Sequence, residues 1–476
     1  MKQNLSKTKI VATLGPASSS KDIMKRMIDE GVDVFRINFS HSGKDEFLKL
    51  VNLIRELNIE MDTHVAVLAD LQGPKLRVGV IENNLLNLAP GDVVTFVSEK
   101  CIGNKDRVYM SYQQFPQDVK TDEMILIDDG KIKLQVIETN KKDTVKAKVI
   151  FGGPLSSHKG VNLPDTKVSL PCLTEEDIAN AVYAIEHDVD WIALSFVRKA
   201  TDVLELQKLI IDNKGHAGVI AKIEKPEALQ EIDLIIENAD GIMVARGDLG
   251  VEMPFDEIPL IQKQIIEKCI NHSKPVIVAT QMMESMITNF TPTRAEATDV
   301  ANAVLDGADA LMLSGETSVG KYPVETIVCM QKIINYTETK GNPFNKQYTP
   351  VEETTTFLAD SICYNATTLA KETKAKAVIT FTHSGYTAFR ISSHRPDADI
   401  FAFTNNIELL QYMSLVWGVR VFYLHTFDQL EEAIQQSIKL LKGKDLLQEG
   451  DCIIHVGSSP LNEHGKTNIL KISHVL

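Results

Sequence analysis

The runs GVIAKIE, at residues 218–224, and GIMVARGD, at residues 241–248, decide the fold of this 476-residue chain. Each run starts as a short, continuously apolar stretch and ends in charged residues. Continuous apolar runs of this length are typical of parallel strands that are buried on both faces. Because side chains alternate along a strand, Lys222 and Glu224 should point the same way at the end of the first run. Asp248 ends the second run, so a second carboxylate can face the first.

These charged strand ends predict the chemistry of the chain. Two carboxylates that face each other from neighbouring strands can bind a hard divalent cation, with Mg²⁺ as the first candidate and Mn²⁺ as the second. The ammonium of Lys222 beside such a cation suggests that the ligand is a phosphate or an enolate. The other interpretation is a structural ion pair between Lys222 and Glu224 that closes the end of a strand.

Similar apolar runs, most of them separated by amphipathic segments of helix length, occur on both sides of these two. The eight runs are residues 9–14, 32–39, 65–71, 191–196, 218–223, 241–245, 275–280 and 310–313. Eight strand–helix units predict an α/β fold, a closed (β/α)8 TIM barrel, whose chemistry lies at the carboxyl ends of the strands. An open, doubly wound sheet has the same kind of strands and is the alternative.

Polar side chains follow most of these runs and are candidate site residues. They are Arg36, Asn38, Ser40, His41, Asp70, Lys222, Glu224, Gly247, Asp248, Thr280, Gln281, Ser314 and Glu316. Between Arg36 and Ser40, the alternation of side chains sends three polar groups to one face. We expect that face to line the inner mouth of the barrel, because a closed barrel has no edge strand.

The segment between the third and fourth runs has a different pattern. Residues 92–98, 124–127, 131–137 and 145–150 are expected to be short strands, and Asp129-Gly130 is a signal for a two-residue hairpin turn. We therefore expect an all-β domain, a β-barrel lid of residues 73–171, inserted into a catalytic barrel of residues 1–72 and 172–340. Gly73-Pro74 and Leu170-Pro171 would serve as its hinges.

The alternation of strands and helices starts again after a polar linker at residues 341–353. Strands are expected at residues 375–381, 399–403, 419–424 and 452–456, and the clearest helices at residues 386–393 and 428–441. Residues 354–476 are therefore predicted to form a third, separate α/β domain.

Composition limits the classes of function. With 50 Lys and Arg against 64 Asp and Glu, the net charge of −14 argues against nucleic acid or an anionic membrane as a partner. The six cysteines stand far apart, so neither a zinc site nor a redox dithiol is expected. Residues 1–9 lack the apolar core of a signal peptide, and no apolar run approaches the roughly 20 residues that span a bilayer. We expect a cytoplasmic protein.

Ten runs together resemble the pyruvate kinase family. They stand in order between residues 8 and 325, with the insertion where the family has it: TKIVATLGPAS, VFRINFSHSG, LQGPKLRVG, KGVNLPD, SFVRKATDV, AKIEKPEAL, MVARGDLGVE, VIVATQMMESM, PTRAEATDVANAV and LSGETSVGKYP. The resemblance implies a glycolytic phosphotransferase that transfers the phosphoryl group of phosphoenolpyruvate to ADP, giving ATP and pyruvate. It also implies a homotetramer and, more loosely, a C-terminal effector-binding domain.

The resemblance further implies roles for individual residues. Glu224 and Asp248 match the Mg²⁺ ligands. Lys222 matches the lysine that stabilises the transferred phosphoryl group and the enolate, and Arg36 matches a contact to the substrate phosphate. Near the substrate carboxylate, the matching residues are Gly247 and Thr280. The residues that fall on or beside nucleotide-contacting positions are Asn38, Ser40, His41, Arg77 and Lys159.

One motif departs from the family pattern. Many members have D-T-K-G-P-E and need K⁺, whereas residues 70–75 of this chain read DLQGPK. An ammonium carries the charge of K⁺, so the change resembles the potassium-independent branch, and K⁺ is not expected to be required. The residues of this monovalent-cation site, or of its lysine substitute, are Asn38, Ser40, Asp70 and Lys75. The alternative is a solvated Lys75 with K⁺ still bound.

A loop of the C-terminal domain is the candidate regulatory site. It contains Thr382, His383, Ser384, Gly385 and Thr387, between a strand and the start of a helix, where N–H groups and hydroxyls can bind an anion. The loop resembles the family's site for phosphorylated effectors, and residues 457–459 and 465–467 would form its far wall. Plain capping of the helix by hydroxyl groups is the alternative.

Two rival functions follow from the same residues. A metal-dependent barrel lyase or aldolase acting on a pyruvate enolate would use the same two carboxylates but would need no nucleotide lid. A metabolite sensor with an inactive barrel is the non-enzymatic rival. The presence of Lys222, Glu224, Asp248 and Thr280 argues against the sensor.

Overall fold

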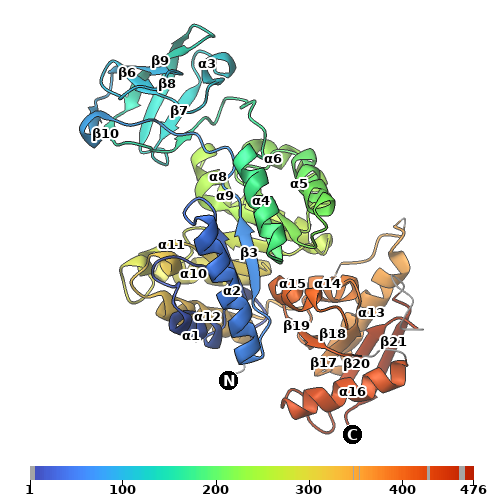
Figure 1. Cartoon of the computed structure of the whole chain (residues 1–476). Helices are drawn as coiled ribbons and strands as arrows, with labels where there is room; N and C mark the ends of the chain where they lie inside the picture. The colour runs from blue at the N-terminus through green and yellow to red at the C-terminus, as the bar shows by residue number, and fades with distance from the viewer. Residues whose placement is uncertain (1–5, 347, 353, 426–428, 460–466) are drawn as a thin grey trace.

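The computed structural model has three bodies and describes residues 6–346, 348–352, 354–425, 429–459 and 467–476. In Figure 1 the barrel lies in the centre in blue, green and yellow, the inserted domain projects above it in cyan, and the C-terminal domain lies at the lower right in orange and red. Over these described ranges, no helix is both long enough and apolar enough to cross a membrane.

Eight parallel strands close into a barrel, which rules out the open sheet. Around the barrel β1, β2, β3, β12, β13, β14, β15 and β16 follow one another, and β16 pairs with β1 again. Their bounds are β1 (Lys9–Thr13), β2 (Val34–Asn38), β3 (Ala66–Asp70), β12 (Trp191–Leu194), β13 (Gly218–Ile223), β14 (Gly241–Ala245), β15 (Val276–Ala279) and β16 (Ala310–Leu313). All eight predicted strands are confirmed, and every strand residue except Asn38 is buried, as continuous apolar runs require.

Helices pack around these strands. The barrel body contains α1 (Lys21–Asp29), α2 (Lys44–Met61), α4 (Glu175–Glu186), α5 (Ala200–Asp212), α6 (Pro226–Gln230), α7 (Ile232–Asn238), α8 (Arg246–Glu252), α9 (Ile258–Asn271), η2 (Glu284–Ile287), α10 (Arg294–Asp306), α11 (Gly315–Ser318) and α12 (Pro323–Gly341). Capping boxes begin α4 and α10: the hydroxyls of Thr174 and Thr293 accept the N–H three residues later, and the acid there bonds back to the cap. Such caps stabilise a helix by about 1 kcal/mol each.

Four aspartates form a repeated feature at the amino-terminal end of the barrel. Each directly precedes an even-numbered barrel strand, counted in chain order, and accepts a backbone N–H from the strand before it. The pairs are Asp33 with Ile10 at 2.9 Å, Asp190 with Val67 at 2.6 Å, Asp240 with Val219 at 2.9 Å, and Asp309 with Val276 at 3.1 Å. These bonds link strands two by two at the end opposite the predicted site.

The inserted domain follows β3 and has its own apolar core. Its elements are η1 (Glu82–Asn84), β4 (Leu86–Leu88), β5 (Val93–Val97), β6 (Arg107–Tyr109), α3 (Phe115–Asp118), β7 (Met124–Ile127), β8 (Ile132–Thr139), β9 (Thr144–Phe151), β10 (Gly153–Leu155) and β11 (Val161–Asn162). The strands form one six-stranded and one two-stranded sheet. Residues 77 and 78 join the two edges of the six-stranded sheet. Arg77 pairs with Gly160 beside β11, and Val78 pairs with Met110 beside β6, as closure into the expected β-barrel requires.

The turn between β7 and β8 differs from the prediction. Four residues, 128–131, connect the two strands instead of two. Asp128, Asp129 and Gly130 all have left-handed backbone, with φ of 55°, 56° and 81°. Three consecutive left-handed residues reverse the chain over a wider loop than the predicted two-residue turn.

Side chains of the barrel hold both connections to the inserted domain. Asp177 accepts the N–H of Gly73 at 3.0 Å in the outgoing connection. Arg198 donates to the carbonyls of Val168 and Leu170, at 2.5 and 2.6 Å, in the returning connection. Hydrogen bonds therefore tie both predicted hinges to the barrel. Beyond the hinges, the inserted domain projects from the barrel (Figure 1).

The C-terminal domain is a five-stranded sheet with helices. Its elements are α13 (Phe357–Thr373), β17 (Ala377–Phe381), α14 (Tyr386–Ser393), β18 (Asp399–Thr404), α15 (Glu408–Tyr412), η3 (Met413–Leu415), β19 (Val419–Tyr423), α16 (Leu430–Gly443), β20 (Cys452–Gly457) and β21 (Ile469–His474). The four predicted strands are confirmed, in the order β19, β18, β17, β20. The sequence analysis missed β21, an antiparallel edge strand with no clear apolar alternation.

The segment predicted as a polar linker packs between the barrel and the C-terminal domain. The N–H of Asn345 donates to the carbonyl of Arg395 at 2.6 Å, and Lys346 donates to the carbonyl of Asp306 at 2.7 Å. Arg395 in turn pairs with Asp309 at the base of the barrel at 2.7 Å. Residues 347 and 353 of the predicted linker lie outside the described residues.

Candidate active site

A buried cluster of charges lies at the carboxyl ends of β2, β3 and β13. The ammonium of Lys222 contacts Ser195 Oγ at 2.7 Å, Glu224 Oε1 at 3.0 Å and Asp70 Oδ1 at 3.1 Å. Asp70, only 1% exposed, also accepts a hydrogen bond from Arg36 Nε at 2.6 Å. One carboxylate thus holds two cations, and the cluster unites four of the predicted site residues.

Burial opposes each of these charges, and the neighbouring charges decide the outcome. Burial lowers the pKa of Lys222, but Asp70 and Glu224 raise it by more, so its pKa lies above the ordinary value. Burial raises the pKa of Asp70, but Arg36 and Lys222 outweigh it, so its pKa lies below the ordinary value. For Glu224 burial prevails over Lys222, and Asp248 adds to it, so its pKa is raised.

Glu224 and Asp248 are the two candidate metal ligands. Glu224 Oε2 accepts the N–H of Phe196 at 2.8 Å, and Asp248 lies in the first turn of α8. In the part of the chain that the structure describes, no group of three or more His, Cys, Asp or Glu side chains is placed to bind a metal ion. Mg²⁺ is commonly bound by one or two carboxylates together with substrate oxygens and water. A buried acid and a half-buried acid that repel each other therefore fit this ion.

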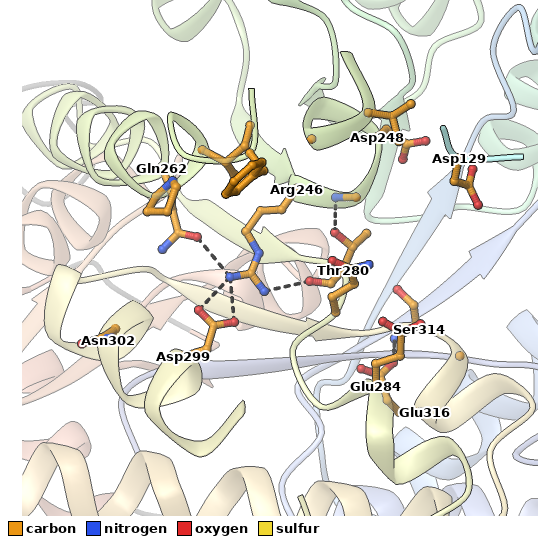
Figure 2. Close-up of a pocket in the computed structure, with 18 of the residues that line it drawn as sticks. Asp129, Arg246, Asp248, Gln262, Thr280, Glu284, Asp299, Asn302, Ser314 and Glu316 are labelled. Carbon is orange, nitrogen blue, oxygen red and sulfur yellow. Dashed lines mark hydrogen bonds and ion pairs between the residues drawn. The ribbon is translucent and has the colours of Figure 1, made fainter. Parts of the chain in front are cut away.

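Thr280, labelled in Figure 2, follows β15 and contacts Gly247, which follows β14. The N–H of Gly247 donates to Thr280 Oγ1 at 2.6 Å, and that hydroxyl donates to the carbonyl of Ala279 at 2.6 Å. A Cβ at position 247 would lie 3.3 Å from Thr280 Oγ1, so glycine permits this approach. Thr280 and Gln281 have left-handed backbone, with φ of 68° and 55°. Such a conformation costs roughly 1–2 kcal/mol per residue, and it is found often at functional sites.

These side chains border a cleft of about 770 Å³, a size that suits a small-molecule ligand. Ser314, directly after β16, and Asp129, from the turn between β7 and β8, line the same cleft (Figure 2). The inserted domain therefore borders the mouth of the barrel. Glu316 is buried and accepts the N–H groups of Met283 and Ser314, so it fixes the surrounding loops.

The predicted nucleotide contacts on the barrel lie at the end of β2. Asn38 is the last residue of that strand, and its Oδ1 accepts the N–H of Ser40 at 2.9 Å. Ser40 lies in the following turn, so the strand alternation applies to Arg36 and Asn38 but not to Ser40. Burial lowers the pKa of His41, and the charges of Lys75, Arg36 and Arg77 lower it further. A group of cations therefore surrounds His41.

The remaining predicted nucleotide contacts lie in the inserted domain, near the hinge. Arg77 pairs with Gly160 in an isolated antiparallel bridge, and its Nη1 donates to the carbonyl of His158 at 3.0 Å. Lys159 pairs with Asp128 at 2.8 Å and is partly exposed. These contacts bring Arg77 and Lys159 together, although 82 positions separate them.

Among the described residues, Lys75 forms no ion pair with Asp70, the charged residue of the predicted monovalent-cation site. Both carboxylate oxygens of Asp70 contact other cations, Arg36 and Lys222. Lys75 is exposed, and its charge acts on His41.

The candidate effector loop caps a helix. Thr382 Oγ1 accepts the N–H of Gly385 at 2.9 Å, and Gly385 precedes α14 with φ of 85°. Thr387 Oγ1 lies 2.8 Å from Thr467 Oγ1, so part of the predicted far wall is adjacent. Residues 465 and 466 of that wall lie outside the described residues. The outer side of the loop consists of His383, 3.0 Å from Asn405, and the exposed Ser384.

Sequence reasoning did not identify two residues of the site. Ser195 accepts a hydrogen bond from Lys222 and donates one to the carbonyl of Leu71 at 2.7 Å. Its signal was present, since Ser195 directly follows β12. Arg246 stands in the run of residues 241–248 without a predicted role, but its guanidinium donates to the carbonyl of Thr280 at 2.8 Å (Figure 2). A contact between residues 34 positions apart leaves no trace in a single sequence.

Comparison with known proteins gives one consistent result. A family model described as pyruvate kinase, barrel domain, matches residues 5–327, and one described as pyruvate kinase, alpha/beta domain, matches residues 360–473. A pyruvate kinase of Agrobacterium vitis is 42% identical over 474 residues, covering 98% of each chain. One of Mycobacterium tuberculosis is 40% identical over 468 residues, also covering 98% of each. The solved structure of a pyruvate kinase from Cryptosporidium parvum has a TM-score of 0.93 at 34% identity, covering 100% of this chain and 98% of that chain.

Proposed function

The chain belongs to the pyruvate kinase family and transfers the phosphoryl group of phosphoenolpyruvate to ADP, and we propose that this reaction takes place at the cluster of Arg36, Lys222, Glu224 and Asp248. The observation that carries this proposal is the contact of one buried carboxylate, Asp70, with both Arg36 and Lys222. Phosphoryl transfer depends on positioning and on charge neutralisation, and two cations held side by side supply both. The comparisons do not favour the lyase or the sensor.

Arg36 and Lys222 neutralise the equatorial oxygens of the phosphoryl group as it moves from phosphoenolpyruvate to the β-phosphate of ADP. The bond from phosphorus to the enol oxygen breaks, and the oxygen keeps the electron pair as an enolate. Lys222 also stabilises this enolate, because its ammonium remains charged beside two carboxylates. Thr280 and Gly247 lie where the substrate carboxylate is expected. The enolate then takes a proton at carbon, for which Thr280, Ser314 and water are the candidate donors.

Members of the family need a divalent metal ion. We assign Mg²⁺, or Mn²⁺ in its place, to Glu224 and Asp248. When bound, the ion supplies positive charge and a template for the phosphoryl oxygens. Asn38, Ser40, His41, Arg77 and Lys159 are assigned to ADP, with the inserted domain of residues 73–171 acting as a lid. Lys159 would exchange its partner Asp128 for a phosphate.

Replacement of Lys222 by Met tests the assignment of the site. Loss of one cation at such a site costs about 3–4 kcal/mol of barrier, so turnover should fall about 10²–10³-fold or more. Pyruvate formation is measured by coupling to lactate dehydrogenase, and circular dichroism and Mn²⁺ binding check the fold and the metal. Near-normal turnover by the variant would overturn the assignment. The variant Lys21→Met, which loses the exposed ion pairs from α1 to Glu56 and Glu60 on α2, is the control and should keep full activity.

We also propose that the enzyme does not need K⁺. The exposed Lys75 adds positive charge near His41, and Asp70 already has two cationic partners. Full activity is expected in a buffer whose only monovalent cation is tetramethylammonium. Strong activation by added KCl would refute this proposal.

Regulation and assembly extend the proposal. We infer that a phosphorylated metabolite binds near Thr382, Ser384 and Thr387, that the enzyme is a homotetramer, and that it works in the cytoplasm. Saturation curves for phosphoenolpyruvate measured with a panel of sugar phosphates and AMP test the first point, and unchanged curves would leave helix capping as the role of the loop. Sedimentation velocity tests the second, and fractionation of cells the third.

A further inference from the structure

Arg246 is the most extensively bonded cation near the candidate active site that has no role in the proposed mechanism. It is the first residue of α8, two positions before the proposed metal ligand Asp248. Its side chain is 14% exposed and pairs with Asp299 on α10 at 2.7 Å. Its Nη2 donates to the carbonyl of Thr280 at 2.8 Å, and its Nη1 lies 3.4 Å from Gln262 Oε1 on α9 (Figure 2). One guanidinium therefore connects β14, the end of β15 and two outer helices.

The backbone that Arg246 holds is unfavourable without a partner. Thr280 and Gln281 are consecutive non-glycine residues in left-handed conformation. At roughly 1–2 kcal/mol for each, the turn persists only where the surroundings fix it. Arg246 provides that support through the Thr280 carbonyl and a longer contact of 3.4 Å to the carbonyl of Ala279. Arginine presents Nη1 to Asp299 and Nη2 to the Thr280 carbonyl from one rigid planar fork, whereas a lysine would have to serve both from a single nitrogen.

We propose that Arg246, held by Asp299, is a positioning residue that sets the place of the Thr280 hydroxyl for the carboxylate of the substrate. The inference rests on the proposed function, because it takes Thr280 to lie at the substrate carboxylate. The direction of the Thr280 side chain follows from its backbone, and the N–H of Gly247 meets its hydroxyl at 2.6 Å. A shift of this turn displaces the hydroxyl from the carboxylate but leaves the ADP contacts on β2 and the lid in place.

The variants Arg246→Lys and Asp299→Asn test the proposal in the full-length enzyme. Both should raise the KM for phosphoenolpyruvate at least tenfold and keep the KM for ADP within twofold. The inhibition constant of oxalate, a planar analogue of the enolate with its carboxylate, should rise by a similar factor. Arg55→Lys is the matched control. Arg55 also pairs with an aspartate, Asp190, and donates to a carbonyl, but it does so at the other end of the barrel. The Arg55→Lys variant should change neither the KM for phosphoenolpyruvate nor the KM for ADP.

Three results separate this inference from the proposed function. If both KM values stay unchanged and only the active fraction falls, Arg246 has a purely structural role and the inference is overturned. If both KM values rise together, the selective effect on the carboxylate end is refuted. If Lys222→Met retains turnover, the site itself is misassigned, whatever Arg246 does. If Arg246→Lys fails to fold, the KM values of Asp299→Asn decide between these outcomes, because this variant keeps the guanidinium of Arg246.

Discussion

Replacement of Asp70 by Asn gives the sharpest prediction, because one buried carboxylate holds both cations of the site. Asp70 contacts Arg36 Nε at 2.6 Å and Lys222 Nζ at 3.1 Å. The amide oxygen of Asn can still accept one of these hydrogen bonds, but its NH₂ group turns donors toward the other cation. The substitution removes the one carboxylate that contacts both cations in this buried place.

Two effects of known size follow. Removal of one partner from a buried ion pair costs about 3–5 kcal/mol of stability. For a domain of this size that corresponds to a thermal midpoint lower by roughly 10 °C. The displaced Arg36 and Lys222 also lose alignment with the phosphoryl group, which should lower kcat about 10²-fold, or about 2.7 kcal/mol of barrier. Thermal melting and the coupled pyruvate assay measure the two effects separately.

Asp190→Asn is the matched control. Asp190 is equally buried, contacts Arg55 at 3.1 Å and the N–H of Val67 at 2.6 Å, but lies at the amino-terminal end of the barrel. Its replacement should lower the melting temperature and leave kcat per folded molecule within twofold. If Asp70→Asn behaves in the same way, the carboxylate is only structural, and the role given to it here is wrong.

Two further predictions concern the other domains. Burial lowers the pKa of His394 and His455 to about 4. The unfolded chain therefore binds protons at a higher pH than the native chain. The free energy of unfolding should fall as the pH drops from 6.5 towards 4, by about 2 kcal/mol per histidine at pH 5. Thermal melts at pH 7.5 and 5 measure this loss, and an equal loss in His394→Asn would contradict it. Asn162→Ala removes the 2.7 Å bond from β11 to Glu252, so amides of the inserted domain near the hinge should exchange faster; unchanged exchange would mean that this bond does not restrain the domain.

The barrel could be predicted because its strands are buried on both faces and are therefore continuously apolar. The predicted strand ends agree with the structure to within two residues. Lys222 and Glu224 contact each other at 3.0 Å, as the alternation rule predicts, although Glu224 lies one residue past the end of β13. The rule does not extend to Ser40, which lies in a turn two residues past the end of β2. In the C-terminal domain, β21 was missed because an exposed edge strand has no apolar pattern.

The contacts that shape the site were much less accessible to sequence reasoning. Asp70 was correctly placed at a strand end, but its simultaneous contact with Arg36 and Lys222 depends on distances between three strands. Arg246 illustrates the same limit, since its partners Thr280 and Asp299 lie 34 and 53 positions away. The closure of the inserted domain also depends on single bridges from residues 77 and 78 to both edges of its sheet, which local patterns do not encode.

The aspartates at the base of the barrel have a consequence for how the chain can be divided. Asp309 receives Arg395 and the N–H of Trp417, and beside Asp33 the ammonium of Lys9 reaches the carbonyl of Val419. The C-terminal domain thus supplies Arg395 as the counter-ion of Asp309, an acid at the amino-terminal end of the barrel. Burial raises the pKa of Asp309 even with Arg395 present. A barrel expressed without the C-terminal domain would therefore contain Asp309 without its cation. During evolution, another domain could replace the C-terminal one only if it placed a cation beside Asp309.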